Sequence, residues 1–322
     1  MTSEEATTNS EEVVLEVDGL RMRYGANDVL RGVSFRAHRG EVVALLGPNG
    51  AGKTTTIEIL EGFRMRSAGR VSVLGTDPAH GDEHWRARLG VVLQSWRDHA
   101  KWRVRELLDH QGSYYARHST DRIRRPWDTG ELMSSVGLAE HSGKQLRMLS
   151  GGQRRRLDVA IGLVGRPEVL FLDEPTAGFD PQARHDFHAL VRDLAAAGET
   201  TVLLTTHDLP EAEKLADRIL ILNGGRIVAD GTAEQLAEQI VGEDEVRWTL
   251  DGRRHRRSTG DSTAFVFDLF KKHGEAVSNL EIRASSLENT YLSLVRGAEQ
   301  STEQSTEQAA EPGAEFGEKE AV

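Results

Sequence analysis

The most informative segment of the chain is Gly47-Pro48-Asn49-Gly50-Ala51-Gly52-Lys53-Thr54-Thr55. It has the pattern G-x-x-x-x-G-K-T and lies between an apolar run, residues 42–46, and a helix-like segment that begins at Thr56. Glycines in such a loop let several backbone N–H groups converge on a phosphate, and the helix dipole adds positive potential there. We expect Lys53 to reach the β- and γ-phosphates and Thr54 to hold Mg²⁺. The segment therefore predicts a binding site for a nucleoside triphosphate.

The composition fits a soluble globular protein, with 38% hydrophobic and 28% charged residues among 322. The net charge of −11 is concentrated at the two ends of the chain. Residues 1–12 hold four glutamates and no cation, and residues 298–322 hold seven glutamates and one lysine. Both ends are predicted to be disordered. The nearly neutral body between them lacks the clustered basic field of a nucleic-acid surface, so no nucleic acid is expected as a partner.

The chain contains no cysteine, which excludes disulfides, thiolate metal sites and cysteine nucleophiles. No apolar run approaches the roughly 18 residues that span a bilayer. The acidic N-terminus is unlike a signal peptide. We therefore expect a cytosolic protein that reaches a membrane only through a partner.

Apolar, strand-like segments alternate with helix-like segments through much of the chain. Strands are expected at residues 42–46, 89–93, 169–172, 201–205 and 219–222, and helices at 57–63, 153–164, 182–196, 210–216 and 233–240. This alternation predicts an α/β fold with a mainly parallel sheet covered on both faces. Further strands are expected at residues 13–17, 28–36 and 70–75, and Asn223-Gly224 predicts a hairpin turn.

Two regions depart from this alternation. Residues 95–148 lack apolar strands and show helical spacing, which indicates a helical insertion. After residue 240 the pattern changes again, with a hairpin at Asp251-Gly252, helices at 262–273 and 286–296 and a strand at 276–283. We expect a small α+β unit over residues 242–297, followed by the disordered tail 298–322.

Two short motifs have alternative interpretations. The segment His80-Gly81-Asp82-Glu83-His84 could suggest a metal site, but it lacks the H-E-x-x-H order and a third ligand, so a solvated turn is expected. The basic run Arg253-Arg254-His255-Arg256-Arg257 could bind phosphate or lipid headgroups. A solvated edge strand is the favoured interpretation, since arginine protects exposed edges.

Three further segments point to phosphate chemistry. Leu149-Ser150-Gly151-Gly152-Gln153 opens a helix and predicts a second anion site. Asp173 and Glu174 end an apolar strand; there Asp173 would hold Mg²⁺ through water, and Glu174 would polarise the attacking water. His207 ends the next strand, where it is either structural or positions that water near the γ-phosphate.

Together these segments resemble the nucleotide-binding subunit of ATP-binding cassette (ABC) transporters, over roughly residues 13–240. The resemblance implies a P-loop ABC ATPase core with a mainly parallel sheet, an antiparallel β subdomain and an inserted helical subdomain at about residues 95–165. It makes residues 47–55 the Walker A loop, Asp173 and Glu174 the Walker B pair, and His207 the switch histidine. It also implies that Tyr24 stacks on adenine and that Gln94 contacts Mg²⁺ and the water.

In this family two chains pack head to tail. The resemblance implies that Ser150, Gly151, Gly152 and Gln153 of one chain, the signature motif, close over ATP held by the other chain, with Asp180 in the D-loop beside them. Since each chain has one Walker A loop and one signature, the expected partner is a second copy of itself. Both sites of the homodimer would be competent for hydrolysis.

A narrower resemblance is to the subgroup that serves ABC-2-type exporters, including daunorubicin-like drug-resistance ATPases. It is carried by Arg154-Arg155-Arg156-Leu157-Asp158-Val159-Ala160 and by Leu287-Glu288-Asn289-Thr290-Tyr291-Leu292. It implies a separately encoded membrane permease, a location on the cytoplasmic face of the membrane, and a drug, antibiotic or other small hydrophobic cargo. Two features depart from the family: Phe179 replaces the usual leucine, and residues 95–101 lack the expected proline-rich continuation. The alternatives are a soluble ABC ATPase acting on nucleic acid or the ribosome, or an ATPase for a lipid or polysaccharide exporter.

Overall fold

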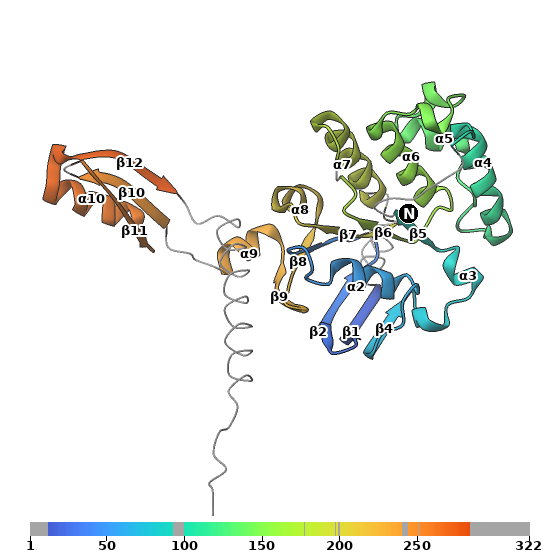
Figure 1. Cartoon of the computed structure of the whole chain (residues 1–322), viewed down its shortest axis with the longest axis horizontal. Coiled ribbons are helices and arrows are strands. Elements are labelled where there is room, and N and C mark those ends of the chain that lie inside the picture. The colour runs from blue at the N-terminus through green and yellow to red at the C-terminus, as the bar shows by residue number, and fades with distance from the viewer. Residues whose placement is uncertain are drawn as a thin grey trace, which may run out of the picture.

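The computed structural model describes residues 12–92, 100–176, 178–196, 198, 200–239, 244–250 and 252–283. Its centre is a six-stranded sheet with the strand order β5-β6-β7-β3-β8-β9 (Figure 1). The strands are β3 (Val42–Leu46), β5 (Leu89–Val92), β6 (Val169–Asp173), β7 (Thr201–Thr206), β8 (Arg218–Asn223) and β9 (Arg226–Gly231). Strands β5, β6, β7, β3 and β8 run parallel, and β9 runs antiparallel to β8. The predicted mainly parallel sheet is confirmed.

The central sheet is covered on both faces because its inner strands carry apolar side chains toward two core clusters, one on each face. All residues of β3 and β6 are buried. On one face they pack with α2 (Lys53–Leu60) and an antiparallel sheet of order β2-β1-β4. The strands of that sheet are β1 (Val13–Tyr24), β2 (Asn27–His38) and β4 (Ala68–Val73). Removing this apolar surface from water is the main force that holds the layers together.

The other face of the central sheet packs against helices. Three of them belong to the helical insertion: α4 (Val104–Tyr115), α5 (Thr129–Ser135) and α6 (Gly151–Leu163). The others are α7 (Pro181–Ala196), α8 (Leu209–Leu215) and α9 (Ala233–Gln239). Short 3₁₀ turns lie at Ala116–His118, Ala139–His141 and Leu146–Met148. Within the described ranges, no helix has the length and apolar character needed to cross a bilayer.

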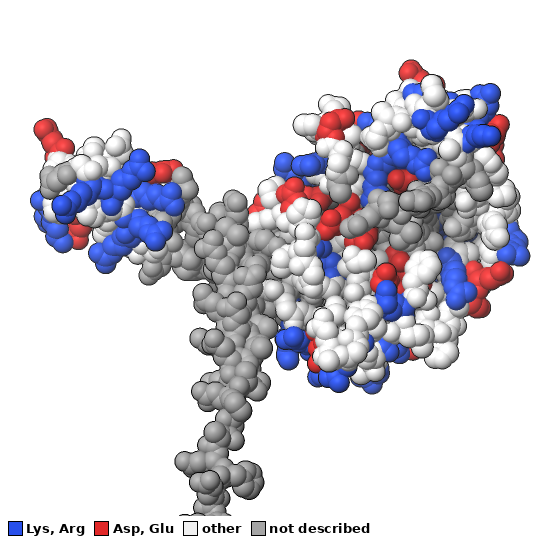
Figure 2. Space-filling model, viewed as in Figure 1, with Lys and Arg blue, Asp and Glu red and all other residues white. Residues whose placement is uncertain are grey.

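Residues 244–283 form a third sheet, with the order β11-β10-β12 and with α10 packed on it (Figure 1). Its elements are β10 (Asp244–Leu250), β11 (Arg253–Thr259), α10 (Ser262–His273) and β12 (Val277–Arg283). Strand β11 is an exposed edge strand, as predicted for the arginine run. Figure 2 shows the concentration of Lys and Arg on this unit. The helix predicted at residues 286–296 and the tail lie outside the described residues.

Some boundaries differ from the predictions. Helix α2 begins at Lys53, earlier than the predicted residue 57, because the left-handed Gly52 (φ 106°) ends the loop and the next residue is already helical. Strand β1 continues past residue 17 to Tyr24 through register shifts that accommodate extra residues. The turn predicted at residues 80–84 is instead a 3₁₀ turn, Pro78–His80, and a short helix, α3 (Glu83–Arg86). In the part of the chain that the structure describes, no cluster of His, Asp or Glu could hold a metal by itself.

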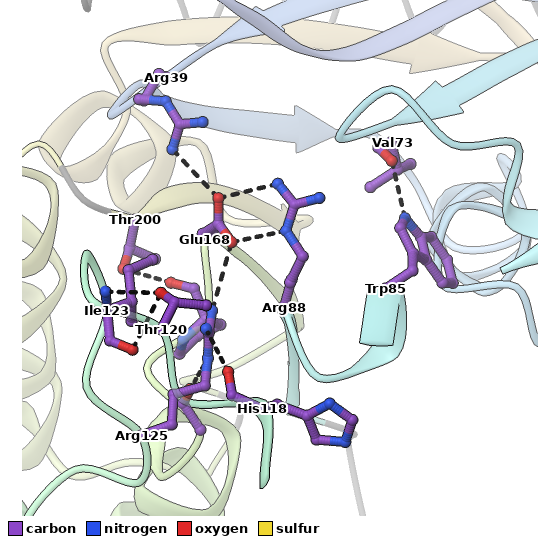
Figure 3. Close-up of polar contacts among 12 residues, drawn as sticks. Arg39, Val73, Trp85, Arg88, His118, Thr120, Ile123, Arg125, Glu168 and Thr200 are labelled. Atoms are coloured by element: carbon purple, nitrogen blue, oxygen red, sulfur yellow. Dashed lines mark hydrogen bonds and ion pairs between the residues drawn. The ribbon is translucent and has the colours of Figure 1, made fainter. Parts of the chain in front are cut away.

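A buried carboxylate, Glu168, joins the helical insertion to the strand layers (Figure 3). Its oxygens accept hydrogen bonds from Arg88 at 2.7 and 3.0 Å and from Arg125 at 3.4 Å. Arg39 lies 3.7 Å away. Burial acts to raise the pKa of Glu168, but the hydrogen bonds and charges of the three arginines outweigh it and hold the pKa below its ordinary value. The cluster lies just before β6, at the opposite end of this strand from Asp173.

Replacing Glu168 by alanine should destabilise the fold by about 3–5 kcal/mol, because Arg125 stays buried without a carboxylate partner, whereas Arg39 keeps its ion pair with Glu12. The folded-state pKa lies below the ordinary 4.5. The contribution is therefore complete above the unfolded-state pKa and is lost as the pH falls through the folded-state value. Urea denaturation at pH 7 and at acid pH measures both effects. Glu83→Ala, at an exposed ion pair, is the control, and an equal loss of stability for both variants would contradict the prediction.

Candidate functional site

The phosphate loop lies between β3 and α2, at the carboxyl edge of the central sheet. The Gly47 N–H donates to the Thr206 carbonyl at 3.2 Å, which fixes the loop to β7. A Cβ on Gly47 would lie 2.3 Å from the Leu222 carbonyl oxygen, and one on Gly52 would lie 2.5 Å from a Leu30 methyl. Gly47 therefore requires glycine because the backbone oxygen cannot move aside, and Gly52 requires it because its φ of 106° is strained for any other residue. The first N–H groups of α2 have no acceptor inside the helix, so they are available to an anion.

The remaining loop residues surround this helix terminus. Part of the loop is accessible to solvent: Pro48, Asn49, Gly50, Thr54 and Thr55 are exposed or half-buried. The rest of the loop is buried, namely Gly47, Ala51, Gly52 and Lys53. The Lys53 ammonium donates to the carbonyls of Gly47 at 2.8 Å and Pro48 at 3.2 Å. It also lies 3.5 Å from a Glu174 carboxylate oxygen. The loop thus surrounds the Lys53 ammonium group, which occupies the region where phosphate oxygens are expected to bind.

Asp173 brings the carboxyl end of β6 to this loop. Its carboxylate accepts a hydrogen bond from the Thr54 hydroxyl at 3.1 Å and one from the Thr205 hydroxyl at 2.6 Å. The contact follows from the strand order, because β7 lies between β6 and β3 and all three are parallel. Hard oxygen donors of this kind suit Mg²⁺. Asp173 and Thr54 therefore place oxygen atoms of the type that Mg²⁺ prefers side by side.

Glu174 and His207 face each other across β6 and β7. The Glu174 Oε1 atom lies 3.3 Å from the His207 Nδ1 atom. Glu174 has an unusual left-handed backbone (φ 45°), and its N–H donates to the Thr205 hydroxyl at 3.0 Å. Strained backbone of this kind persists where the surroundings hold it, and it is concentrated at functional sites. The pair is half-buried at Glu174 and exposed at His207, so it is open to a bound ligand.

Arg155, from helix α6, binds the backbone on both sides of Glu174. This buried guanidinium donates to the Pro175 carbonyl at 2.8 Å and the Asp173 carbonyl at 3.3 Å. Burial lowers the pKa of Arg155. The helix that carries the second anion site is thereby attached to the turn that carries the two carboxylates.

The second anion site opens helix α6. The Ser150 hydroxyl accepts a hydrogen bond from the Gln153 N–H at 3.3 Å, and the Gln153 amide oxygen accepts one from the Ser150 N–H at 3.1 Å. This capping box leaves the N–H groups of Gly151 and Gly152 and the hydroxyl proton of Ser150 for a ligand. Ser150 and Gly151 are exposed. Among the residues that the structure describes, no hydrogen bond or ion pair connects this terminus to the phosphate loop of the same chain.

The other predicted residues lie around this centre. Asp180 is exposed and caps α7 by accepting a hydrogen bond from the Ala183 N–H at 2.8 Å. Tyr24, at the end of β1, is 40% exposed, and the Arg64 guanidinium lies 5.1 Å from its ring centroid. A stacked base would use the other ring face or displace Arg64. Gln94 lies outside the described residues.

Phe179, the departure from the family pattern, fits the core without an exposed ring. It is 9% exposed and packs edge to face with Phe187, with ring centroids 5.9 Å apart.

A second buried group near the site is Glu61, at the end of α2. Burial, followed by the charges of Asp173 and Glu58, raises the pKa of Glu61 to about 8. Burial therefore favours the neutral form of this carboxyl group.

The sequence interpretation missed three residues that support the site: Thr205, Arg155 and Glu211. Thr205 lies in a strand that was identified only by its apolar pattern. Arg155 was noticed only as part of the run Arg154-Arg155-Arg156. Glu211 carries no motif, and its contacts, described below, join segments that are far apart in the sequence.

Comparisons with known proteins agree with this geometry. The family model described as ABC transporter matches residues 30–177. Nod factor export ATP-binding protein I of Ralstonia nicotianae is 43% identical over 235 residues, which cover 72% of this chain and 71% of that protein. Daunorubicin resistance ATP-binding protein DrrA3 of Streptomyces coeruleorubidus is 41% identical over 238 residues, 72% of each. A solved ATP-binding subunit of an ABC transporter superposes with a TM-score of 0.62 at 29% identity, over 70% of this chain and 93% of that one.

Proposed function

Because the chain belongs to the ATP-binding subunits of ABC transporters, which hydrolyse ATP, we propose that it powers a separate membrane permease as a head-to-tail dimer. In this dimer, ATP lies between the phosphate loop of one copy and the Ser150–Gln153 terminus of the other. ATP binding closes the two copies and hydrolysis reopens them, and this cycle drives export.

The observation that carries the proposal is the separation of the two anion sites within one chain. Lys53 and the phosphate loop lie at the carboxyl edge of the sheet, whereas Ser150 and Gly151 are exposed at the start of α6 and make no hydrogen bond to that loop among the described residues. Within a single copy, the phosphate loop and the start of α6 therefore cannot bind the same phosphate. A second copy, related by a two-fold axis, supplies both missing halves at once.

The side chains of each copy have distinct roles in the proposed reaction. Lys53 and the loop N–H groups bind the β- and γ-phosphates and oppose their charge. Glu174 accepts a proton from the water that attacks the γ-phosphate, and His207, 3.3 Å from Glu174, holds that water and the phosphate in line. Ser150 and Gly152 of the other copy donate to the γ-phosphate, so these contacts are lost when the phosphate leaves.

Magnesium fits the residues present. Asp173 and Thr54 supply oxygen donors within 3.1 Å of each other, and Gln94 is proposed as a further ligand. When bound, the cation neutralises charge on the phosphates. Tyr24 is proposed to stack on adenine, and Asp180 and Gln153 to lie at the interface between the two copies.

Mixing two inactive variants tests the shared site. Lys53→Ala removes the loop cation, and Gly151→Asp places a carboxylate against the γ-phosphate. The second change should not disturb the fold, because an added Cβ at Gly151 meets nothing within 4 Å. In the mixed dimer one site receives both defects and the other neither, so mixing should restore about a quarter of the wild-type rate of ATP hydrolysis.

Gly151→Ala is the matched control in this experiment, since it adds a Cβ without charge and should retain most of the activity. If the mixture of Lys53→Ala and Gly151→Asp stays as inactive as either variant alone, the head-to-tail site is rejected.

The proposed cargo is a drug, antibiotic or other small hydrophobic compound, because relatives are named for daunorubicin resistance and Nod factor export. The protein would then lie at the cytoplasmic face of the membrane through an ABC-2-type permease. Copurification with a multi-span membrane protein, and lowered daunorubicin accumulation in cells that express both, support this assignment. DNA binding with a steep salt dependence would instead favour a soluble ABC ATPase that acts on nucleic acid.

A further inference from the structure

We propose that Glu211 is a positioning residue that keeps the loops of Glu174 and His207 in register. The carboxylate of Glu211 accepts hydrogen bonds from two threonine hydroxyls, Thr176 to Oε1 and Thr206 to Oε2, both at 2.5 Å. Each oxygen therefore holds one of the two loops. The inference rests on the proposed function of Glu174 and His207.

The two threonines directly flank the catalytic pair. Thr176 follows Glu174 and Pro175 at the end of β6, and Thr206 immediately precedes His207 at the end of β7. The Thr176 carbonyl also accepts a hydrogen bond from the Phe179 N–H at 3.0 Å, which shapes the turn that leads to Asp180. A displacement at either threonine would therefore move a reacting side chain or the D-loop.

Glu211 is also hydrogen-bonded to the segment that contains His207, which lies between β7 and α8. Asp208 caps helix α8 by accepting the Glu211 N–H at 3.4 Å, and the Asp208 N–H donates to the Thr206 hydroxyl at 3.0 Å. A closed circuit thus runs from Glu211 through Thr206 and Asp208 back to Glu211. His207 lies inside this circuit, so its backbone is fixed on both sides.

The bridge is isolated from water. Glu211 is 3% exposed, Thr176 5% and Thr206 2%. Burial raises the pKa of Glu211, and the hydrogen bonds from Thr176 and Thr206 oppose this rise. Loss of either hydrogen bond leaves a buried polar atom unsatisfied. His188 of α7 lies 3.8 Å from Glu211, but burial lowers its pKa, so its neutral ring leaves the two threonines as the principal partners of the carboxylate.

The consequence for catalysis concerns the distance between Glu174 and His207, which is 3.3 Å in the structure. The two residues follow different strands, and in the proposed reaction their side chains must contact the same water and γ-phosphate. Misplacement of a catalytic group by about 1 Å can cost up to about a hundredfold in rate. Loss of the bridge should therefore lower the rate of hydrolysis while the phosphate loop still binds ATP.

The test compares Glu211→Gln, Thr176→Val and Thr206→Val in the full chain with its permease. Each substitution keeps the size of the side chain: each valine removes a hydroxyl donor, and the glutamine replaces one of the two acceptor oxygens by an NH2 group. We expect kcat to fall about tenfold in each variant, with the dissociation constant for ATP changed less than about twofold. In a double-mutant cycle, the two threonine substitutions should be non-additive in kcat, because either one already breaks the bridge.

Glu168→Gln provides the structural control, since it weakens a buried carboxylate cluster at the far end of β6. If the variants of Glu211, Thr176 and Thr206 lose as much stability as Glu168→Gln and have the same kcat as Glu168→Gln, the inference is overturned. Independent, additive effects of the two threonines would do the same. If Glu174→Gln also retains full turnover, the proposed function fails; if only the Glu211 bridge variants behave like the control, the positioning role alone fails.

Discussion

Glu174→Gln should nearly abolish ATP hydrolysis while ATP binding persists, so that the protein accumulates as an ATP-bound dimer. The amide has the shape of the carboxylate but cannot accept the proton of the attacking water, and loss of a general base typically costs about 10²–10⁴ in rate. The change also removes the negative charge that lies 3.5 Å from the Lys53 ammonium. With that charge gone, phosphate oxygens no longer compete with a carboxylate for the cation, and the closed state is stabilised.

Phosphate release measures the loss of turnover, and light scattering after gel filtration with saturating ATP measures the dimer. Glu213→Gln makes the same chemical change at an exposed position of α8 and should behave like the wild type in both assays. A Glu174→Gln protein that stays monomeric at saturating ATP, both in solution and with its permease, would show that the head-to-tail arrangement is wrong.

Lys53→Ala should instead weaken ATP binding strongly. The Lys53 side chain is 5% exposed and its ammonium already lies against the carbonyls of Gly47 and Pro48, so its charge is directed at the loop interior and not at solvent. Hydrogen bonds to a charged group contribute about 1.5–3 kcal/mol each, so losing even one corresponds to roughly ten- to a hundredfold weaker binding.

Titration calorimetry with ATP and Mg²⁺ measures this change, and thermal unfolding checks that the variant is folded. Lys214→Ala, at an exposed position, removes the same charge elsewhere and should leave the affinity unchanged. An unaltered affinity in Lys53→Ala would contradict the assignment of the phosphate loop.

Much of the fold could be predicted because its signals are local. Residues 42–46 and 169–172 are apolar over their full length, and such runs form strands buried on both faces wherever helices separate them. Parallel strands end at one edge of the sheet, so the motifs that follow them meet there. The structure brings Lys53, Thr54, Asp173, Glu174 and His207 together at that edge.

What the sequence determined by itself is therefore the fold class, the family and the set of side chains at the carboxyl edge of the sheet, because each depends on periodicity or on residues close together in the chain. The tertiary structure alone decided which groups hold that set in place. Glu211 reaches Thr176 across 35 positions, Arg155 of α6 reaches Pro175 in the turn after β6, and Glu168 contacts three arginines from separate segments. Such contacts depend on the angle and register at which whole elements pack, and no local pattern of residues encodes these quantities.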